Sequence, residues 1–178
     1  PKELHNVRSQ ITGSVRQLCA AASKAAVELG YEPVILTADL CCEAREAGSF
    51  LAAIAQTHKG DGKSLAYIAG GETVVHLTGK GLGGRNQEIA LSAAKGIDGI
   101  ENCAVFSLGS DGTDGPTDAA GGICTGESAE KLRQAGLSPD EVLRENDAYH
   151  ALKAIDGLLF TGPTGTNVND LSCLLLRR

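Results

Sequence analysis

The chain has no methionine and no tryptophan, and aromatic residues make up only 3% of its 178 positions. Its hydrophobic share of 42% therefore comes mainly from alanine, leucine, isoleucine and valine, a mixture suited to helices packed closely on a sheet. No apolar run approaches the ~20 residues of a membrane-spanning helix, and no signal peptide is recognisable. The lack of methionine, together with a proline at position 1, leads us to expect a piece of a longer protein.

A basic stripe is also lacking, since acidic and basic residues alternate and the net charge is −6, which argues against a nucleic-acid partner. Neither a P-loop nor a GxSxG motif is present. The six cysteines include no CxxC spacing, and the four histidines do not cluster with them. We therefore expect structural thiols in a reducing cytoplasm and no zinc site.

The hydrophobic pattern predicts alternating strands and helices. Ser14 and the pair Ser138-Pro139 are typical helix starts, while Gly30 and Gly136 are typical helix ends. The predicted helices are 15–29, 42–57, 86–95, 127–134, a short one from 138 and 148–155, and the predicted strands are 7–12, 33–38, 64–69, 73–78, 103–108, 122–125, 158–161 and 171–176. We predict one three-layer α/β/α domain over residues 1–178 with a mainly parallel or mixed sheet, opened by a βαβα segment over 1–62.

An acidic loop follows the predicted strand 103–108. It places Asp111, Asp114 and Asp118 among four glycines and a proline. Loops at the carboxyl ends of strands are common ligand sites in α/β sheets, and nearby carboxylates that repel one another are relieved by a hard cation. The three carboxylates therefore predict a Mg²⁺ site, although Asp, Gly and Pro also form ordinary solvated turns.

A glycine-rich segment, 70–88, precedes a predicted helix and carries Lys80 and Arg85. A cation at a helix start opposes the helix dipole, so Arg85 suggests a functional reason for its position. The free N–H groups of that helix start, with the two cations, predict a phosphate site. Its further expected members are Glu72, Gly83, Gly84 and Asn86.

The same segment allows a second interpretation. Residues 79–84 match GxGxxG, and Asp111 follows the next predicted strand, so a nicotinamide dinucleotide site is an alternative. A third polar segment, 161–170, offers hydroxyls and amides at Thr164, Thr166 and Asn167 for a hydroxy acid or a phosphate. These groups could equally cap the turn internally. We expect all three segments to meet at one rim of the sheet.

Three strings then carry a resemblance to a known family: GGETVVHLTGKGLGGRNQE at 70–88, DGTDGPTDAAG at 111–121 and TGPTGTNVNDL at 161–171. They closely resemble the C-terminal region of the type-2 glycerate kinases, called the MOFRL domain, whose members are often labelled hydroxypyruvate reductases. The segments NVRSQITGSV and LGYEPVILTADLCCEAREAG resemble the stretch just before that region. One departure is Val74, where the family is expected to carry threonine.

The resemblance implies ATP-dependent phosphorylation of D-glycerate to 2-phosphoglycerate. Lys80 and Arg85 would neutralise the phosphoryl group, and Asp111 or Asp114 would hold Mg²⁺ or accept the hydroxyl proton. It also implies an N-terminal domain that completes the cleft, so we expect these residues alone to be inactive. An NAD(P)H-dependent hydroxypyruvate reductase and a non-catalytic anion-binding domain remain alternatives, and a homodimer is a further expectation.

Overall fold

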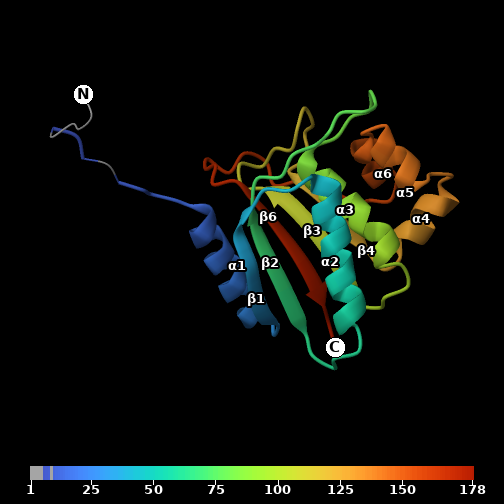
Figure 1. The fold of residues 1–178 in the computed structure, drawn as a ribbon, viewed down its shortest axis with the longest axis horizontal. Helices are drawn as coiled ribbons and strands as arrows, with labels where there is room; N and C mark the ends of the chain where they lie inside the picture. The colour runs from blue at the N-terminus through green and yellow to red at the C-terminus, as the bar shows by residue number, and fades with distance from the viewer. Residues whose placement is uncertain (1–5, 9) are drawn as a thin grey trace.

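The computed structural model describes residues 6–8 and 10–178, in which a six-stranded sheet has helices on both faces (Figure 1). The helices are α1 (Val15–Glu28), α2 (Ala44–His58), α3 (Arg85–Gly96), α4 (Ser128–Gln134), α5 (Pro139–Arg144) and α6 (Ala148–Ala154). The strands are β1 (Glu32–Leu40), β2 (Leu65–Gly71), β3 (Cys103–Gly109), β4 (Gly121–Thr125), β5 (Leu158–Leu159) and β6 (Asp170–Leu176).

The strands are ordered β1-β2-β6-β3-β4-β5. Strands β1 and β2, joined through α2, pair in parallel, as the opening βαβα pattern predicts. All other neighbours pair antiparallel, so the sheet is mixed rather than mainly parallel. Two of these antiparallel pairings come from β6, which lies between β2 and β3 and runs against both. Its first residue, Asp170, is therefore opposite Gly71 and Gly109, the last residues of those two strands.

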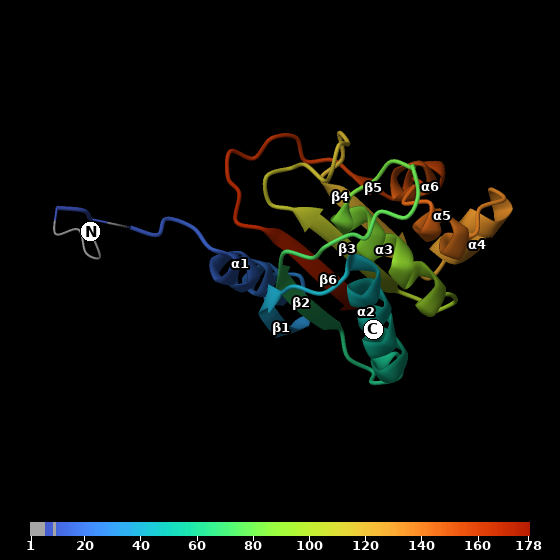
Figure 2. The ribbon, with the colours of Figure 1, turned by 45° about the horizontal axis from the view of Figure 1, so that its top comes forward.

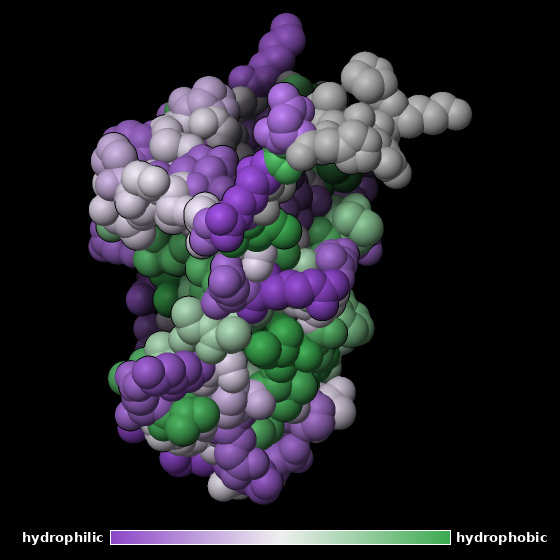
Figure 3. All heavy atoms as spheres, turned by 90° about the vertical axis from the view of Figure 1, so that its left-hand side faces the viewer, coloured by the Kyte–Doolittle hydropathy of each residue, from purple (hydrophilic) through white to green (hydrophobic). Residues whose placement is uncertain are grey.

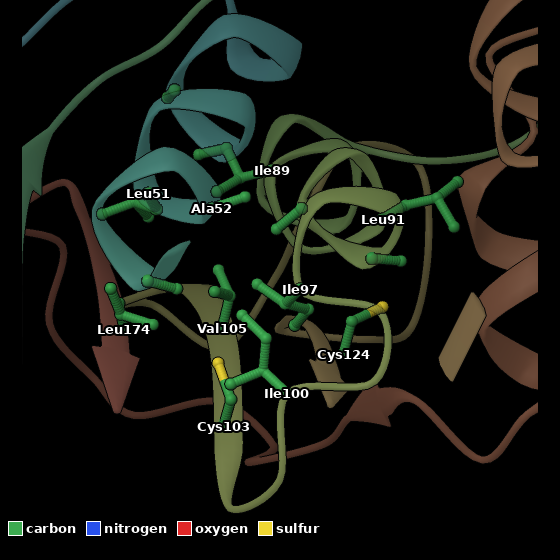
Figure 4. Packing of buried hydrophobic residues seen from close by; sticks show 14 of the residues in the cluster. Leu51, Ala52, Ile89, Leu91, Ile97, Ile100, Cys103, Val105, Cys124 and Leu174 are labelled. Atoms are coloured by element: carbon green, nitrogen blue, oxygen red, sulfur yellow. The ribbon is translucent and has the colours of Figure 1, made fainter. Parts of the chain in front are cut away.

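Alternating residues of the strands bury two separate apolar faces, because successive strand side chains point to opposite sides. On one face, Cys19 and Ala26 of α1 pack with Ala66 and Ile68 of β2. The other face carries the larger cluster, where α2 and α3 cover β3 and β6 (Figure 4). Its labelled members include the buried residues Leu51, Ile89, Val105 and Leu174. The predicted three-layer α/β/α arrangement is confirmed.

Two predicted strands do not form. Residues 7, 8 and 10–12 are exposed and pair with no strand of the described sheet, and Ser9 lies outside the described residues. In 73–78, only Val74 makes a bridge, to Glu43, so this stretch continues as a loop instead of a strand. Both stretches have β-prone residues, but neither has a neighbouring strand that could complete its hydrogen bonds.

In contrast to these two strands, the predicted helix ends at Ser14, Gly30 and Gly136 are confirmed. Ser14 begins α1, and its Oγ accepts a hydrogen bond from the Gln17 N–H at 3.3 Å. Gly30 and Gly136 have positive φ angles of 85° and 74°, as helix-terminating glycines often do. All six cysteines are free, and four of them are buried, in agreement with structural thiols.

The outer edge of the sheet is formed by β1. Its Val34 and Ile35 are exposed, as is Phe50 of the neighbouring α2. Figure 3 looks onto this side of the molecule, where hydrophobic residues lie between polar ones. No helix within the described part of the chain is both long and apolar enough to cross a membrane.

Candidate functional site at the carboxyl edge of the sheet

The three polar segments meet at the edge where β2 and β3 end and β6 begins, as predicted (Figure 2). They enclose an open cleft of about 1040 Å³, in the size range of small-molecule sites. Of the predicted site residues, those that line it are Glu72, Gly83, Gly84, Arg85, Asp111, Asp114 and Asn167. Those that do not are Lys80, Asn86, Asp118, Thr164 and Thr166.

Arg85 is fixed in the wall of the cleft by two carboxylates. Its Nε and Nη2 donate to the two carboxylate oxygens of Asp170 at 2.5 and 3.2 Å, and its Nη1 donates to Glu72 at 3.0 Å. The Asp170 side chain is buried, whereas the Glu72 side chain is 57% exposed. The hydrogen bond that Arg85 donates to Asp170 raises the pKa of Arg85 above its ordinary value. The pair with Asp170 thus orients the guanidinium, and Glu72 covers its open side.

Asp114 caps helix α3 from a distance in sequence. Its Oδ1 accepts hydrogen bonds from the Asn86 N–H and side-chain amide, both at 3.1 Å, and its Oδ2 accepts from the Gln87 N–H at 2.9 Å. Burial raises the pKa of Asp114 to about 6, and these hydrogen bonds oppose the rise. The helix start at which the sequence predicts a phosphate group is therefore occupied by a carboxylate of the chain itself.

The glycine before α3 is required by this contact. A Cβ atom on Gly84 would lie 2.3 to 2.5 Å from the carboxyl atoms of Asp114, closer than real Cβ contacts allow. Asn86, predicted to bind substrate or phosphate, is buried behind this contact and its Oδ1 accepts from Ser107 of β3. Asn86 therefore anchors α3 to the sheet instead of lining the cleft.

Asp111 is the loop carboxylate with the most open setting in the cleft. Its Oδ1 accepts hydrogen bonds from the Thr113 N–H at 2.9 Å and the Thr113 hydroxyl at 3.0 Å. Its Oδ2 accepts from the Asn167 amide at 3.1 Å, which ties the acidic loop to the 161–170 segment. The Thr164 hydroxyl donates to the carbonyls of Ser110 and Thr166 and accepts from the Thr166 N–H, so Thr164 takes the internal capping role and Thr166 takes part through its backbone.

The three loop carboxylates do not form the predicted common Mg²⁺ site. Asp118 accepts a hydrogen bond from the Tyr149 hydroxyl at 2.7 Å, and Asp114 faces α3. Within residues 6–8 and 10–178, no group of three or more His, Cys, Asp or Glu side chains is arranged to hold a metal ion. The loop separates its carboxylates because each has a different partner in another element.

The loop that carries Lys80 is held by the turn between α5 and α6. Asn146 Oδ1 accepts from the N–H groups of Thr78 and Gly79 at 2.7 and 2.9 Å, and Asp147 Oδ1 accepts from the Leu82 N–H at 2.9 Å. A Cβ atom on Gly79 or Gly81 would collide with the backbone of Glu145 or Asp147. These two glycines of the GxGxxG match therefore serve packing. A dinucleotide site also needs a strand directly before the motif, and residues 73–78 form a loop, so that context does not form.

Sequence reasoning missed four buried polar residues of the cleft: Thr73, Glu88, Asn146 and Asp170. Asp170 had a usable signal, because it stands between a polar loop and the apolar run that forms most of β6. The other three had none, since their roles depend on contacts with distant segments.

Comparison with known proteins identifies the family of this fold and cleft. A family model described as "MOFRL family" matches residues 65–170, which is more than half of the chain and includes every residue that lines the cleft. The chain belongs to the MOFRL family. In overall structure this MOFRL chain is similar to the crystal structure of glycerate kinase from Thermotoga maritima, with a TM-score of 0.94, 52% identity, and coverage of 99% of this chain and 44% of that one.

Named relatives of this MOFRL chain fall into two groups. D-glycerate 2-kinase from Thermotoga maritima is 53% identical over 175 residues, which are 96% of this chain and 42% of the relative. A protein from Agrobacterium vitis that bears a hydroxypyruvate reductase name is 39% identical over an alignment of 183 positions. This alignment covers 96% of this chain and 48% of the relative. The MOFRL chain therefore spans less than half the length of these relatives.

Proposed function

We propose that the protein containing this chain is a glycerate 2-kinase, which transfers the γ-phosphoryl group of ATP to the 2-hydroxyl of D-glycerate. The observation that carries the proposal is the Arg85 guanidinium fixed in the cleft wall, in a chain 53% identical to a D-glycerate 2-kinase. Phosphoryl transfer depends mainly on positioning and on neutralising charge, and a planar guanidinium suits phosphate and carboxylate oxygens.

Each residue of the cleft wall has a role in this proposal. Asp170 keeps the Arg85 guanidinium oriented, and Glu72 holds its outer N–H until an anionic group replaces it. The backbone of Gly83 and Gly84 lines the cleft beside Arg85, and the Asn167 amide offers a polar contact. Lys80, which is exposed on its loop, would reach phosphate oxygens from the rim.

The charge of the cleft supports a requirement for Mg²⁺. One guanidinium lines it, that of Arg85, against the five carboxyl groups of Glu72, Glu88, Asp111, Asp114 and Asp170. A polyanionic nucleotide needs additional positive charge in such surroundings. Asp111 fits the ion, because carboxylate oxygen is a preferred Mg²⁺ ligand and a nucleotide-bound Mg²⁺ needs only one or two protein carboxylates. Bound there, Mg²⁺ would neutralise charge on the phosphate oxygens.

The longer relatives bear on the rest of the active site. Because this chain spans 44% of the Thermotoga maritima structure, we propose that a second domain forms the opposite wall of the cleft and excludes water from it. Its contribution would include further cations, which the cleft wall described here lacks. A homodimer and a cytoplasmic location remain predictions.

Coupled assays on the natural gene product that contains these 178 residues test the proposal. ADP release that depends on both D-glycerate and Mg²⁺ is expected. NADH or NADPH oxidation with hydroxypyruvate, without ADP release, would replace the kinase by the reductase. Neither activity, combined with measurable binding of glycerate or ATP, would favour a non-catalytic anion-binding domain.

A further inference from the structure

Two residues that line the cleft bury an oxygen atom without a hydrogen-bond partner. Thr73 is 3% exposed and Glu88 is 2% exposed. Within residues 6–8 and 10–178, neither Thr73 Oγ1 nor Glu88 Oε2 has a partner. The large majority of buried polar side-chain atoms in proteins do have one, so each of these two atoms requires an explanation.

The Glu88 carboxyl group is held in place by its other oxygen. Glu88 Oε1 accepts a hydrogen bond from Asn146 Nδ2 at 2.8 Å, and the same amide also donates to the His76 carbonyl at 3.1 Å. Burial raises the pKa of Glu88, and the bond from Asn146 opposes the rise. Asn146 therefore fixes the group and leaves Oε2 available.

The position of these atoms separates them from the other buried, unpartnered polar atoms of the described chain. Those others belong to Arg45 and Gln87, and neither residue lines the cleft. Thr73 comes from the segment after β2, and Glu88 from the first turn of α3, so two separate parts of the chain each bring one such oxygen to the same cleft. Chance packing faults would not be expected to coincide there.

We propose that Thr73 and Glu88 form a subsite for an aliphatic hydroxyl group of the bound ligand. A hydroxyl both donates and accepts, so it can satisfy the threonine oxygen and either protonation state of the carboxyl group. An anionic group would be repelled by Glu88. This inference rests on the proposed kinase function, which supplies two sources of such a hydroxyl: the 3-hydroxyl of glycerate and the ribose of the nucleotide.

The subsite would determine specificity. A site built to hydrogen-bond a hydroxyl rejects the analogue that lacks it, because its own buried polar groups then stay unpaired. D-Lactate is D-glycerate without the 3-hydroxyl, and it keeps the 2-hydroxyl that accepts the phosphoryl group. 2′-Deoxy-ATP and 3′-deoxy-ATP each lack one ribose hydroxyl. These three compounds identify which ligand places its hydroxyl against Thr73 and Glu88.

The test measures kcat/KM for D-glycerate, D-lactate, ATP and the two deoxynucleotides, using the natural gene product that contains this chain. Thr73→Val is isosteric but lacks the hydroxyl, and Glu88→Gln keeps an oxygen for Asn146 while replacing the free acceptor by a donor. Thr73→Ser restores the hydroxyl. Ser128→Ala is the matched control, because it removes a hydroxyl that is equally buried but lies in α4, outside the cleft.

We expect Thr73→Val and Glu88→Gln each to lower kcat/KM at least about tenfold for the ligand that carries the hydroxyl and less than about twofold for its deoxy analogue. Thr73→Ser and Ser128→Ala should keep the wild-type discrimination. Equal losses on both members of every pair, or no loss, would overturn the subsite. Absence of ADP formation by the wild type would instead overturn the kinase function, and titration calorimetry with the same pairs would then decide on the subsite alone.

Discussion

The cleft wall and the loop before α3, whose ribbon Figure 1 shows, hold their cations Arg85 and Lys80 in opposite ways. Arg85 begins a helix and bonds to Asp170 and Glu72. Lys80 is exposed on a loop that is attached to the protein through hydrogen bonds of its neighbours Thr78, Gly79, Gly81 and Leu82. The two cations lie five positions apart in one glycine-rich segment. Their difference shows that a shared motif does not give shared positioning, and only the wall provides a fixed charge.

Substituting each cation is the strongest test of this comparison. Arg85→Ala should lower kcat by about 10³-fold or more, because a fixed cation on a transferring phosphoryl group contributes on that scale. Lys80→Ala should lower it less than about tenfold, since an exposed lysine loses much of its effect to solvent. ADP release by both variants, with melting temperatures to verify folding, decides the matter. Equal losses of kcat in the two variants would mean that Lys80 acts as a fixed charge, as Arg85 does.

The carboxylate behind Arg85 should matter for both activity and stability. Asp170→Asn removes the paired charge, and a displaced guanidinium should lower kcat by about 10²-fold. The free energy of unfolding should fall by about 2 kcal/mol, because a half-buried cation loses its buried partner. Asp98→Asn breaks a surface pair with Arg133 and serves as control, with an expected change below ~1 kcal/mol. Similar losses in the two variants would refute a special role for Asp170.

The acidic loop offers a smaller contrast within itself. Asp111→Asn should raise the Mg²⁺ concentration for half-maximal activity by about tenfold, because it removes a proposed ligand charge. Asp118→Asn should leave that concentration unchanged, since Asp118 bonds to Tyr149 outside the cleft. Magnesium titrations of ADP release compare them. An unchanged requirement in Asp111→Asn would move the ion to another carboxylate or to the second domain.

The same contrast explains what the sequence could predict. Helix ends depend on neighbouring residues, so Ser14, Gly30 and Gly136 indicated them correctly. The position of Arg85 against the helix dipole also indicated a reason beyond the helix, and the structure supplies one in Asp170. Such a signal is local, even though its explanation lies 85 residues away.

Long-range partners could not be predicted in this way. The antiparallel insertion of β6 joins Asp170 to Gly71, and no local pattern encodes that pairing. In the sequence the three carboxylates of the acidic loop resemble one cluster. In the structure, however, Asp114 accepts hydrogen bonds from α3 and Asp118 accepts one from Tyr149. Their separation depends on which elements pack beside the loop, and composition does not contain that information.

The smallest expected effect concerns Asp114, the carboxylate of the loop that we assign to structure. Asp114→Asn should lower the free energy of unfolding by about 1 kcal/mol near neutral pH through the weakened helix cap. In the folded protein the pKa of Asp114 is raised from 3.8 to about 6, so the folded state binds this proton more tightly than the unfolded state. The stabilisation of the folded state that comes from this tighter proton binding is complete below about pH 4 and is lost as the pH rises through about 6.

Asparagine does not titrate, so the difference in unfolding free energy between wild type and Asp114→Asn should shrink as the pH rises from about 4 to about 7. Burial raises the pKa of Glu88 as well, and the charge of Asp114 adds to that rise, so the comparison is made in a Glu88→Gln background, where this second titration is absent. Urea denaturation across this range measures it. A constant difference would mean that the hydrogen bonds from α3 balance the burial of Asp114, and a difference that grows with pH would mean that they outweigh it and lower its pKa below the ordinary value.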